Sequence, residues 1–506
     1  MSCEGYCRRQ SAGAGTDPTL TTHRTISVGI QESPSDADKH SNAKIVRRMA
    51  DTITITEEAE SRRQYRQIVD PEVLLALAGY AALVIVSLSH AAQLLEPDDY
   101  AYQASIRALR EGHILLSTAQ YSALELQISS SGGLGVAQWH HLASGYWISE
   151  KNPGYPFFAV IFSILHVSRA TPLFFGAVAC IALFFGARAW LGRYAGTYAV
   201  LLYCSSGAAL AFAWREMMPT FTDASLIAAA FGTLVYVGCT PSLSERKKTL
   251  LGLAAFVALE SSAFIRYTDA LELGVVIIAT ISLKRVASWS WRSVAIWMGS
   301  VMVFVCAVLA FDWWAYGSPT STGYSDGEIS FSISALWPNL TGMPKYLLAS
   351  MPLAVLAATA FFWIIIRLSM TTSNAPREVA AARLRDATIG AILAVGWLGM
   401  WVLYLTYPWT VTQMSGLQVD AVHLVRFYLP ALGCLALLST YVLVKLGRRF
   451  AFAIAAALFI AGALSFHSLT QSQPQFQIPP TAMASVTHVG PLDQTVANRT
   501  TSTKVS

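Results

Sequence analysis

Two adjacent carboxylates follow the first long apolar segment of the chain, within Glu96-Pro97-Asp98-Asp99-Tyr100. An ionised carboxylate close to hydrocarbon is costly unless it faces water or a partner group. Asp98 and Asp99 are therefore candidate catalytic residues, because apolar surroundings raise a carboxylate pKa toward the range in which it takes a proton from a hydroxyl. The same spacing equally suits an N-cap by Asp98, with Asp99 interacting with the helix dipole, and both roles can coexist.

Isolated cations occur in two other segments. Lys151 lies in a Pro- and Gly-containing stretch, 150–156, and Arg426 begins an apolar segment. Either side chain could neutralise a phosphate, and an arginine could do so bidentately. Anchoring at the edge of a membrane explains both residues as well.

Other polar residues accompany these two groups at the ends of apolar segments. The candidate supporting residues are Tyr102, Asp223, Arg266 and Tyr324. Asp223 could cap the next helix, and Arg266 could form a structural pair with Asp269 one turn away. Tyr324 ends a loop, 316–324, whose Gly, Pro and hydroxyl residues predict turns with exposed backbone donors.

The composition identifies the class of protein. The chain has 506 residues, of which 54% are hydrophobic and 13% charged, against about 25% charged in soluble domains. It is therefore an all-α, multi-pass membrane protein. Its net charge of +5 needs no nucleic-acid partner, because the basic residues lie between apolar segments, as membrane topology requires.

The apolar segments predict about eleven membrane helices, with ten to thirteen as the range. The expected spans are 72–95, 172–191, 194–214, 223–240, 249–265, 268–283, 293–314, 346–366, 387–407, 425–446 and 450–468. Basic loops alternate with acidic ones along this order, which places the basic side in the cytoplasm. The acidic side carries every candidate residue, and also Asp326, Glu328 and Asp420.

The same pattern predicts the domain organisation. Residues 1–70 are expected to form a disordered cytoplasmic tail, 71–468 the membrane domain, and 469–506 a short flexible tail outside the cytoplasm. The first outer loop, 96–171, contains an apolar stretch, 155–168, that is too short to span and should form an interfacial or re-entrant helix. Tyr102, Ile106 and Leu109 share one face of a helix, which predicts an amphipathic helix on the membrane surface.

In these motifs the sequence resembles the C-type membrane glycosyltransferases, and among them glycosyltransferase family 39, which includes protein O-mannosyltransferases and lipid A aminoarabinose transferases. Residues 97–102 resemble the family's Pro-Asp-Glu motif with its following Tyr, and 150–153 its Glu-Lys-Pro-Pro. Residues 222–224, 316–324 and 426–430 are similar to its Thr-Asp-Ala, Tyr-Gly-Ser-Pro-x-x-x-Gly-Tyr and Arg-Tyr-x-x-Pro segments. Asp99 departs from the usual Glu, and Asn152 from the first Pro.

The resemblance implies a function. It implies transfer of a hexosyl or pentosyl group from a polyprenyl-phosphate donor to a hydroxyl of a protein, lipid or glycan on the extracytoplasmic face. It gives the catalytic role to Asp98, the donor phosphate to Lys151, and a supporting role to Asp223. A divalent metal is compatible with this chemistry, although no ligand spacing demands one. The expected location is the plasma membrane of a prokaryote, or the endoplasmic reticulum of a eukaryote.

A transporter or flippase is the alternative. It would use the outer acids as a proton relay, and it predicts charged residues near helix midpoints and interrupted, repeated helices. Glu260, within the expected span 249–265, is the clearest residue of that kind.

Overall fold

The structure is a computed structural model. It describes residues 70–90, 97–130, 138–287, 289–324, 329–369, 377–415 and 421–471. The expected tails, 1–69 and 472–506, lie outside the described residues, as do Asp326, Glu328 and Asp420. The described residues belong to one compact unit that begins at Asp70.

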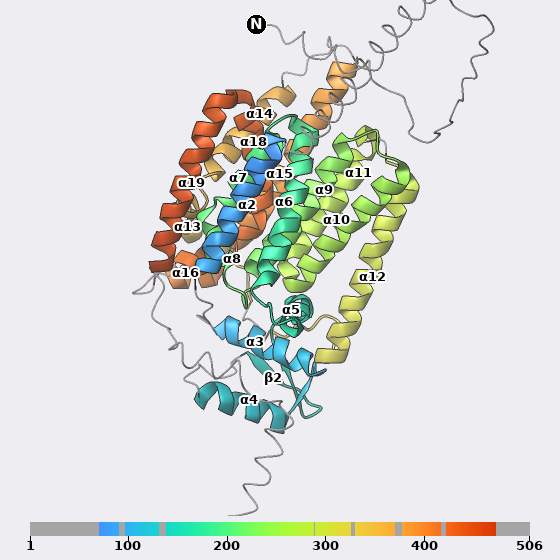
Figure 1. The fold of residues 1–506 in the computed structure, drawn as a ribbon. Helices are drawn as coiled ribbons and strands as arrows, with labels where there is room; N and C mark the ends of the chain where they lie inside the picture. The colour runs from blue at the N-terminus through green and yellow to red at the C-terminus, as the bar shows by residue number, and fades with distance from the viewer. Residues whose placement is uncertain are drawn as a thin grey trace, which may run out of the picture. The chain divides into compact units, whose positions relative to one another are not determined.

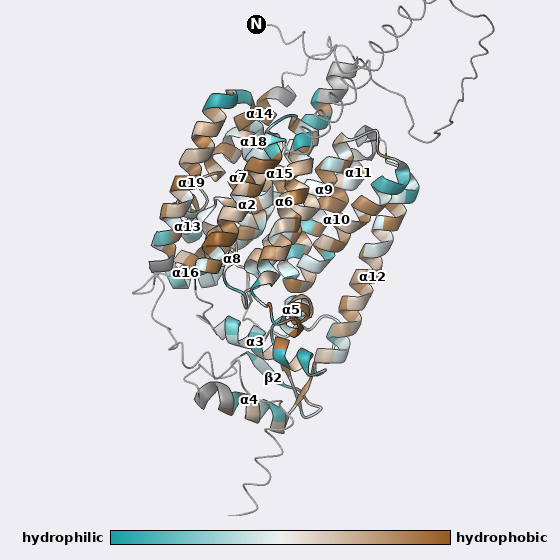
Figure 2. Ribbon diagram, in the orientation of Figure 1, coloured by the Kyte–Doolittle hydropathy of each residue, from teal (hydrophilic) through white to brown (hydrophobic). Residues whose placement is uncertain are grey.

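Long apolar helices make up most of the described chain (Figure 1). They are α2 (Pro71–Ser89), α6 (Ala170–Leu191), α9 (Thr220–Cys239), α10 (Glu245–Ile265), α11 (Ala270–Ala287), α12 (Trp291–Tyr316), α15 (Arg377–Leu405), α18 (Leu432–Leu446) and α19 (Arg448–Gln471). Hydrophobic residues run along these helices, and polar residues gather at their ends (Figure 2). This is the pattern of a multi-pass helical membrane protein.

The spans match the expected order, although fewer of them qualify as straight membrane helices. Eight helices among the described residues are long and apolar enough to cross a membrane, or up to ten when each bent pair counts as one span. The remaining expected span, 268–283, corresponds to α11, which is not among these ten. The fold class is as expected, and the exact count of eleven is not confirmed among the described residues.

Two of the expected spans are sharply bent. Helix α7 (Ala195–Cys204) meets α8 (Gly207–Ala213) at 63°, and α13 (Leu336–Ser350) meets α14 (Ala354–Ser369) at 109°. Pro352 lies in the second break, where its ring removes a backbone donor and restricts the residue before it. The two breaks touch, because the hydroxyl of Ser206 donates to the carbonyl of Ser350 at 3.2 Å. Each bend is therefore supported by the other.

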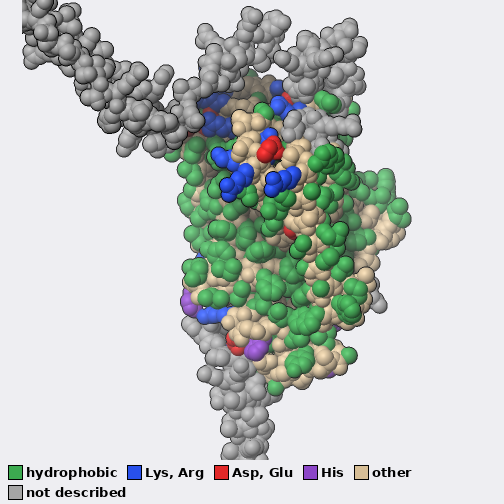
Figure 3. Space-filling model, turned by 90° about the vertical axis from the view of Figure 1, so that its right-hand side faces the viewer, with side chains coloured by type: hydrophobic (Ala, Val, Ile, Leu, Met, Phe, Trp, Pro, Cys, Tyr) green, Lys and Arg blue, Asp and Glu red, His purple; other side chains and the backbone are tan. Residues whose placement is uncertain are grey.

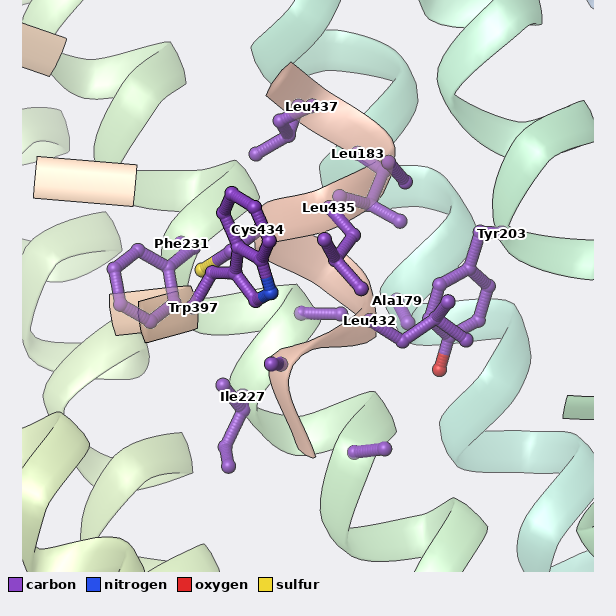
Figure 4. Close-up of a cluster of buried hydrophobic side chains, with 14 of the residues drawn as sticks. Ala179, Leu183, Tyr203, Ile227, Phe231, Trp397, Leu432, Cys434, Leu435 and Leu437 are labelled. Atoms are coloured by element: carbon purple, nitrogen blue, oxygen red, sulfur yellow. The ribbon is translucent and has the colours of Figure 1, made fainter. Parts of the chain in front are cut away.

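Helix α18 lies at the centre of the packing. Its residues Leu432 to Leu438 are all fully buried, as expected for a helix that is apolar on every side. Figure 4 shows this helix surrounded by side chains from other helices. The labelled members of the cluster are Ala179, Leu183, Tyr203, Ile227, Phe231, Trp397, Leu432, Cys434, Leu435 and Leu437.

The first outer loop is folded at one end of the bundle. It contains α3 (Pro97–Arg110), α4 (Thr118–Ser130) and α5 (Gly154–Ile164), the last being a short apolar helix within the expected stretch 155–168. Three strands, β1 (Leu116–Ser117), β2 (Trp139–His141) and β3 (Tyr146–Ser149), form an antiparallel sheet in the order β1-β3-β2. This sheet was not expected from the sequence, because strands of two to four residues are too short to show alternation.

Helix α3 has an apolar and a polar face, as expected. Tyr102 and Ile106 on the apolar face are buried, together with Ala101, Ala104 and Ala108. Helix α5 packs against α3 (Figure 1). Protein therefore covers much of the apolar face of α3.

Short elements complete the end of the bundle that carries the outer loop. They are α16 (Pro408–Met414), α17 (Ala421–Val425) and the 3-10 turns η2 (Tyr267–Asp269), η3 (Ile333–Ala335) and η4 (Leu429–Ala431). Lys and Arg side chains gather near the other end, as Figure 3 shows for the face that it presents. This end includes the first turn of α10, where Arg246, Lys247 and Lys248 lie.

Candidate active site

The carboxylate of Asp98 is the centre of a charged cluster. Its Oδ1 atom lies 3.1 Å from Nζ of Lys151 and accepts a hydrogen bond of 2.8 Å from Nε2 of Gln138. Its Oδ2 atom accepts a hydrogen bond of 2.9 Å from Nη1 of Arg426. Both oxygens of Asp98 are thus held by donors that come from distant parts of the chain.

The charges of this cluster set the protonation state of Asp98. Burial alone raises the pKa of a carboxylate, but the charges of Lys151 and Arg426 outweigh that effect and hold the pKa of Asp98 well below its ordinary value. Burial lowers the pKa of Lys151, and the charge of Asp98 reverses this and raises it. The carboxylate and the ammonium are therefore both charged at neutral pH.

Each member of the cluster is positioned by the end of a secondary-structure element. Asp98 lies in the first turn of α3, where a negative charge interacts well with the helix dipole. Lys151 lies between β3 and α5, and Arg426 between α17 and η4. Gln138 precedes β2 and adopts a left-handed backbone conformation with φ of 69°, which is uncommon for a residue with a side chain. Helix ends and turns, rather than helix midpoints, build the site.

The loop after α12 brings Tyr324 to Lys151. The Nζ atom of Lys151 lies 5.1 Å from the centre of the Tyr324 ring, within the range of a cation–π interaction. A Cβ atom at Gly323 would clash with the backbone carbonyl oxygen of Glu150. Only glycine allows this approach of the loop to the segment that carries Lys151.

Tyr102 lies on the same face of α3 as Asp98. It is 5% exposed, and its ring meets that of Tyr155 edge-on at 5.5 Å. Burial raises the pKa of Tyr102 well above its ordinary value, the nearby Tyr324 and Asp98 raise it further, and Arg266 and Arg426 lower it. Tyr102 therefore lies among the other candidate residues as a neutral hydroxyl.

Arg266 and Asp223 form the next layer of the site. The Nε atom of Arg266 lies 3.8 Å from Oδ2 of Asp223, its Nη2 atom donates to Thr220 at 2.8 Å, and its Nη1 atom donates to the backbone oxygen of Arg426 at 3.4 Å. The ion pair expected with Asp269 is thus replaced by one with Asp223. Asp269 accepts instead from Ser262, whose hydroxyl contacts both carboxylates.

Aromatic rings cover the two arginines. The guanidinium carbon of Arg426 lies 4.7 Å from the ring centre of Phe427 and 5.4 Å from that of Trp409. Arg266 lies 5.9 Å from the ring of Phe427. These contacts hold both guanidinium groups while leaving their charge undiminished.

Asp99 does not share the surroundings of Asp98. Its Oδ2 atom lies 2.7 Å from Nη2 of Arg215, in a pair whose side chains are only 1% and 0% exposed. Successive residues of a helix point about 100° apart, so adjacent acids on α3 cannot both face one centre. Asp99 therefore does not share the contacts that Asp98 makes with Lys151 and Arg426, and it fastens α3 to the segment between α8 and α9. Its catalytic role remains a prediction.

The structure thus brings together Asp98, Lys151, Arg426, Tyr102, Arg266 and Tyr324, with Asp223 behind Arg266 and Asp99 apart. Two contributors were not singled out from the sequence, namely Gln138 and Arg215. Gln138 lies in a polar loop without any motif. Arg215 adjoins Glu216 in a segment that could be recognised only as an outer helix end.

A small cavity lies beside Lys151. Its lining includes Lys151, Ser149, Leu109 and Tyr316, and its volume of about 30 Å³ is enough for about one or two water molecules. Of the charged cluster around Asp98, Lys151 alone lines it. Among the described residues, no group of three or more His, Cys, Asp or Glu is arranged to hold a metal ion.

Glu260, the residue that would favour a transporter, accepts a hydrogen bond from a neighbouring helix. Glu260 is 7% exposed on α10 and accepts a hydrogen bond of 2.8 Å from the hydroxyl of Ser300 on α12. This bond satisfies one carboxyl oxygen within a helix–helix contact. Glu260 belongs to none of the contacts described for Asp98.

Comparisons with known proteins give distant structural similarities. No family model matches the chain, and no curated protein matches it. The structure is similar to ArnT from Cupriavidus metallidurans in the apo state (16% identity, TM-score 0.47, covering 84% of this chain and 77% of that one). It is also similar to the same protein bound to undecaprenyl phosphate (14%, 0.43, 86% and 78%).

A third similarity is to the archaeal oligosaccharyltransferase AglB from Archaeoglobus fulgidus, in complex with an inhibitory peptide and a dolichol-phosphate (10%, TM-score 0.41, covering 78% of this chain and 56% of that one). Because all three TM-scores lie below 0.5, we assign no residue role from these proteins. The fold and the site themselves define a class: a multi-pass helical membrane protein with a buried, charged cluster at the loop-bearing end of its bundle.

Proposed function

We propose that the protein is an integral-membrane glycosyltransferase that moves one sugar from a polyprenyl-phosphate donor to an acceptor hydroxyl. The observation that carries this proposal is the clamp formed by Lys151 and Arg426 around the carboxylate of Asp98. Two cations that converge on one anion suit a phosphate, and an acid between them suits the removal of a hydroxyl proton.

The geometry supports an ordered mechanism. In the resting site Asp98 occupies the place that a phosphate oxygen would take between Lys151 and Arg426. Arrival of the donor phosphate moves both cations to the phosphate and releases Asp98. Without these two charges, burial raises the pKa of Asp98, so the freed carboxylate becomes a better base.

The transfer is a single displacement that involves no change of oxidation state. Asp98 takes the proton of the acceptor hydroxyl, and the oxygen forms a bond to the anomeric carbon of the sugar. The bond from that carbon to the phosphate oxygen breaks, and its electron pair leaves with polyprenyl phosphate. Lys151 and Arg426 stabilise the charge on the leaving phosphate. A single in-line displacement inverts the anomeric centre.

The remaining residues position this centre. Arg266, held by Asp223, fixes the backbone of Arg426 through a hydrogen bond to its carbonyl. Tyr324 lies against Lys151, and Tyr102 lies beside Asp98 on α3. Asp99, paired with Arg215, keeps the first turn of α3 in place. We assign these residues to substrate binding and positioning.

We infer that the site faces the extracytoplasmic side. Basic residues, including Arg246, Lys247 and Lys248 in the first turn of α10, mark the opposite end of the bundle. Basic loops remain preferentially in the cytoplasm. The acceptor is then a protein, lipid or glycan outside the cytoplasm, at the plasma membrane of a prokaryote or in the endoplasmic reticulum of a eukaryote.

Reconstitution tests the proposal. The full chain, in lipid vesicles with a labelled polyprenyl-phosphate sugar and candidate acceptors, should form a new glycosidic bond. Asp98→Asn should abolish transfer, while the variant remains folded and still unfolds cooperatively on heating. The matched control is Asp386→Asn, in a partly exposed ion pair with Arg385 that plays no part in the site. Full transfer by Asp98→Asn would remove Asp98 from the mechanism.

A transporter or flippase is the second candidate. Two observations favour it: the bent pairs α7–α8 and α13–α14, and Glu260 buried within α10. This function predicts movement of the labelled sugar lipid across the vesicle membrane without a new glycosidic bond. It also predicts that Glu260→Gln abolishes this movement.

A further inference from the structure

A large cavity lies on the side of α3 that faces away from Asp98. Its volume is about 660 Å³, far larger than the space beside Lys151. Arg107 follows Asp98 by nine positions on α3, which corresponds to about 180° around a helix and about 13 Å along it. The cavity is therefore separate from the reaction centre.

The cavity combines cations with an apolar wall. Its charged and titratable members are Arg107, Arg110, His166, Arg169 and Glu216. Its apolar members include Leu88 at the end of α2 and Leu173 in the first turn of α6, together with Ile106 and Leu124. Three arginines against one glutamate give the lining a net positive charge, which is complementary to an anion.

One of these cations is fixed by the membrane helices themselves. The Nη2 atom of Arg169 donates to the backbone oxygens of Ser87 at 2.8 Å and of His90 at 2.5 Å. Arg107 is steadied by an ion pair with Glu111 at 3.5 Å. Guanidinium groups therefore line both the α2–α6 side and the α3 side of the cavity.

The neighbouring surface is suited to lipid. On α5 and its C-cap, Phe157, Ile161, Ile164 and Leu165 recur at helical spacing and are exposed, with Ile161 at 56% and Leu165 at 64%. The cavity is bounded by Ser163 near the end of this helix and by residues 166–170 after it. An apolar exposed face beside a cationic cavity is the arrangement of an interfacial lipid contact.

We propose that this cavity binds the phosphate-bearing headgroup of a membrane lipid. The guanidinium groups of Arg107, Arg110 and Arg169 hold the phosphate, and the acyl chains lie along the wall formed by Leu88 and Leu173. This lipid is held rather than glycosylated, because the cavity and Asp98 lie on opposite faces of α3. The inference concerns binding alone and does not depend on the transfer reaction.

Lipid binding to the full chain in neutral detergent tests the proposal. The probe is a short-chain phosphatidylglycerol, followed by native mass spectrometry, with phosphatidylcholine and inorganic phosphate as comparison arms. The double variant Arg107→Gln/Arg110→Gln should weaken phosphatidylglycerol binding about tenfold or more. The control Lys247→Gln/Arg292→Gln removes the same charge at exposed positions outside the cavity and should bind as the unaltered protein does.

A second variant tests lipid binding without changing the charge of the cavity. Ser163→Trp would fill part of the cavity and should also weaken phosphatidylglycerol binding, while Lys151→Met, in the reaction centre, should leave it unchanged. Unaltered binding by the arginine double variant would overturn the proposal. Inorganic phosphate that competes as well as the lipid would also overturn it, since the site would then take a free anion. Weakening by Lys151→Met would place the lipid at the reaction centre instead.

Discussion

The Nη1 atom of Arg426 lies 2.9 Å from Oδ2 of Asp98, although 328 positions separate the two residues in the chain. Lys151 contacts the other carboxylate oxygen from a third segment. This contact makes Asp98 a competitor of any phosphate that the two cations would bind. A base that merely lay beside a phosphate site would not show such competition.

If Asp98 competes with a phosphate for Lys151 and Arg426, its substitution should affect phosphate binding and catalysis in opposite directions. Asp98→Asn should abolish transfer but strengthen binding of polyprenyl phosphate about tenfold, because loss of a competing ion pair of about 1.4 kcal/mol corresponds to that ratio. Affinity for polyprenyl phosphate in detergent measures this, with Asp386→Asn as the control. Weaker binding by Asp98→Asn would show that the carboxylate supports the phosphate site instead of competing for it.

The charged cluster also predicts how stability depends on pH. The folded-state pKa of Asp98 lies below its ordinary value of about 4. The ionised carboxylate therefore contributes its full stabilisation above about pH 4, and the contribution is lost only as pH falls through the lower folded-state pKa. The difference in unfolding temperature between the unaltered protein and Asp98→Asn should be constant from about pH 5 to pH 8 and narrow in strong acid. If the difference in unfolding temperature already became smaller at neutral pH, Asp98 would not have a lowered pKa in the folded protein.

The buried pair of Asp99 and Arg215 predicts a large loss of stability. Removal of one partner leaves an uncompensated buried charge, which costs about 3 to 5 kcal/mol, so Asp99→Ala should strongly lower the unfolding temperature. The comparison is Asp386→Asn, which breaks an ion pair with Arg385 in which both side chains are partly exposed, at 38% and 31%, at a cost of about 0 to 1 kcal/mol. Equal losses in the two variants would mean that Asp99 and Arg215 are not a buried pair.

Substitution of Gly323 should lower transfer by displacing the backbone of its loop. Gly323→Ala places a methyl group against the carbonyl oxygen of Glu150, so the loop must move away and take Tyr324 from Lys151. Transfer should fall several-fold, with a higher Michaelis constant for the sugar donor. Gly274→Ala is the matched control, because a Cβ atom at Gly274 meets nothing within 4 Å. Unchanged kinetics for Gly323→Ala would show that the loop does not position the site.

The sequence by itself determined the membrane class and the order of the spans. Hydrocarbon accepts only segments whose backbone groups bond internally and whose side chains are apolar, and such segments are visible as composition. It also indicated Asp98, Lys151, Arg426, Tyr102, Arg266 and Tyr324 as candidates, because charged and hydroxyl groups at helix ends stand out against apolar neighbours. The breaks in α7–α8 and α13–α14 and the short sheet in the outer loop were not visible, since local pattern carries no such signal over a few residues.

The tertiary structure alone decided which charges meet. Asp98 and Asp99 are the same residue type at adjacent positions, but they point in different directions from the helix. Asp98 contacts Lys151 and Arg426, whereas Asp99 contacts Arg215. The partner of Arg266 is Asp223 on another helix rather than the nearby Asp269. Ion pairs form between groups that are close in space, and helix packing, which depends on the whole chain, sets those distances.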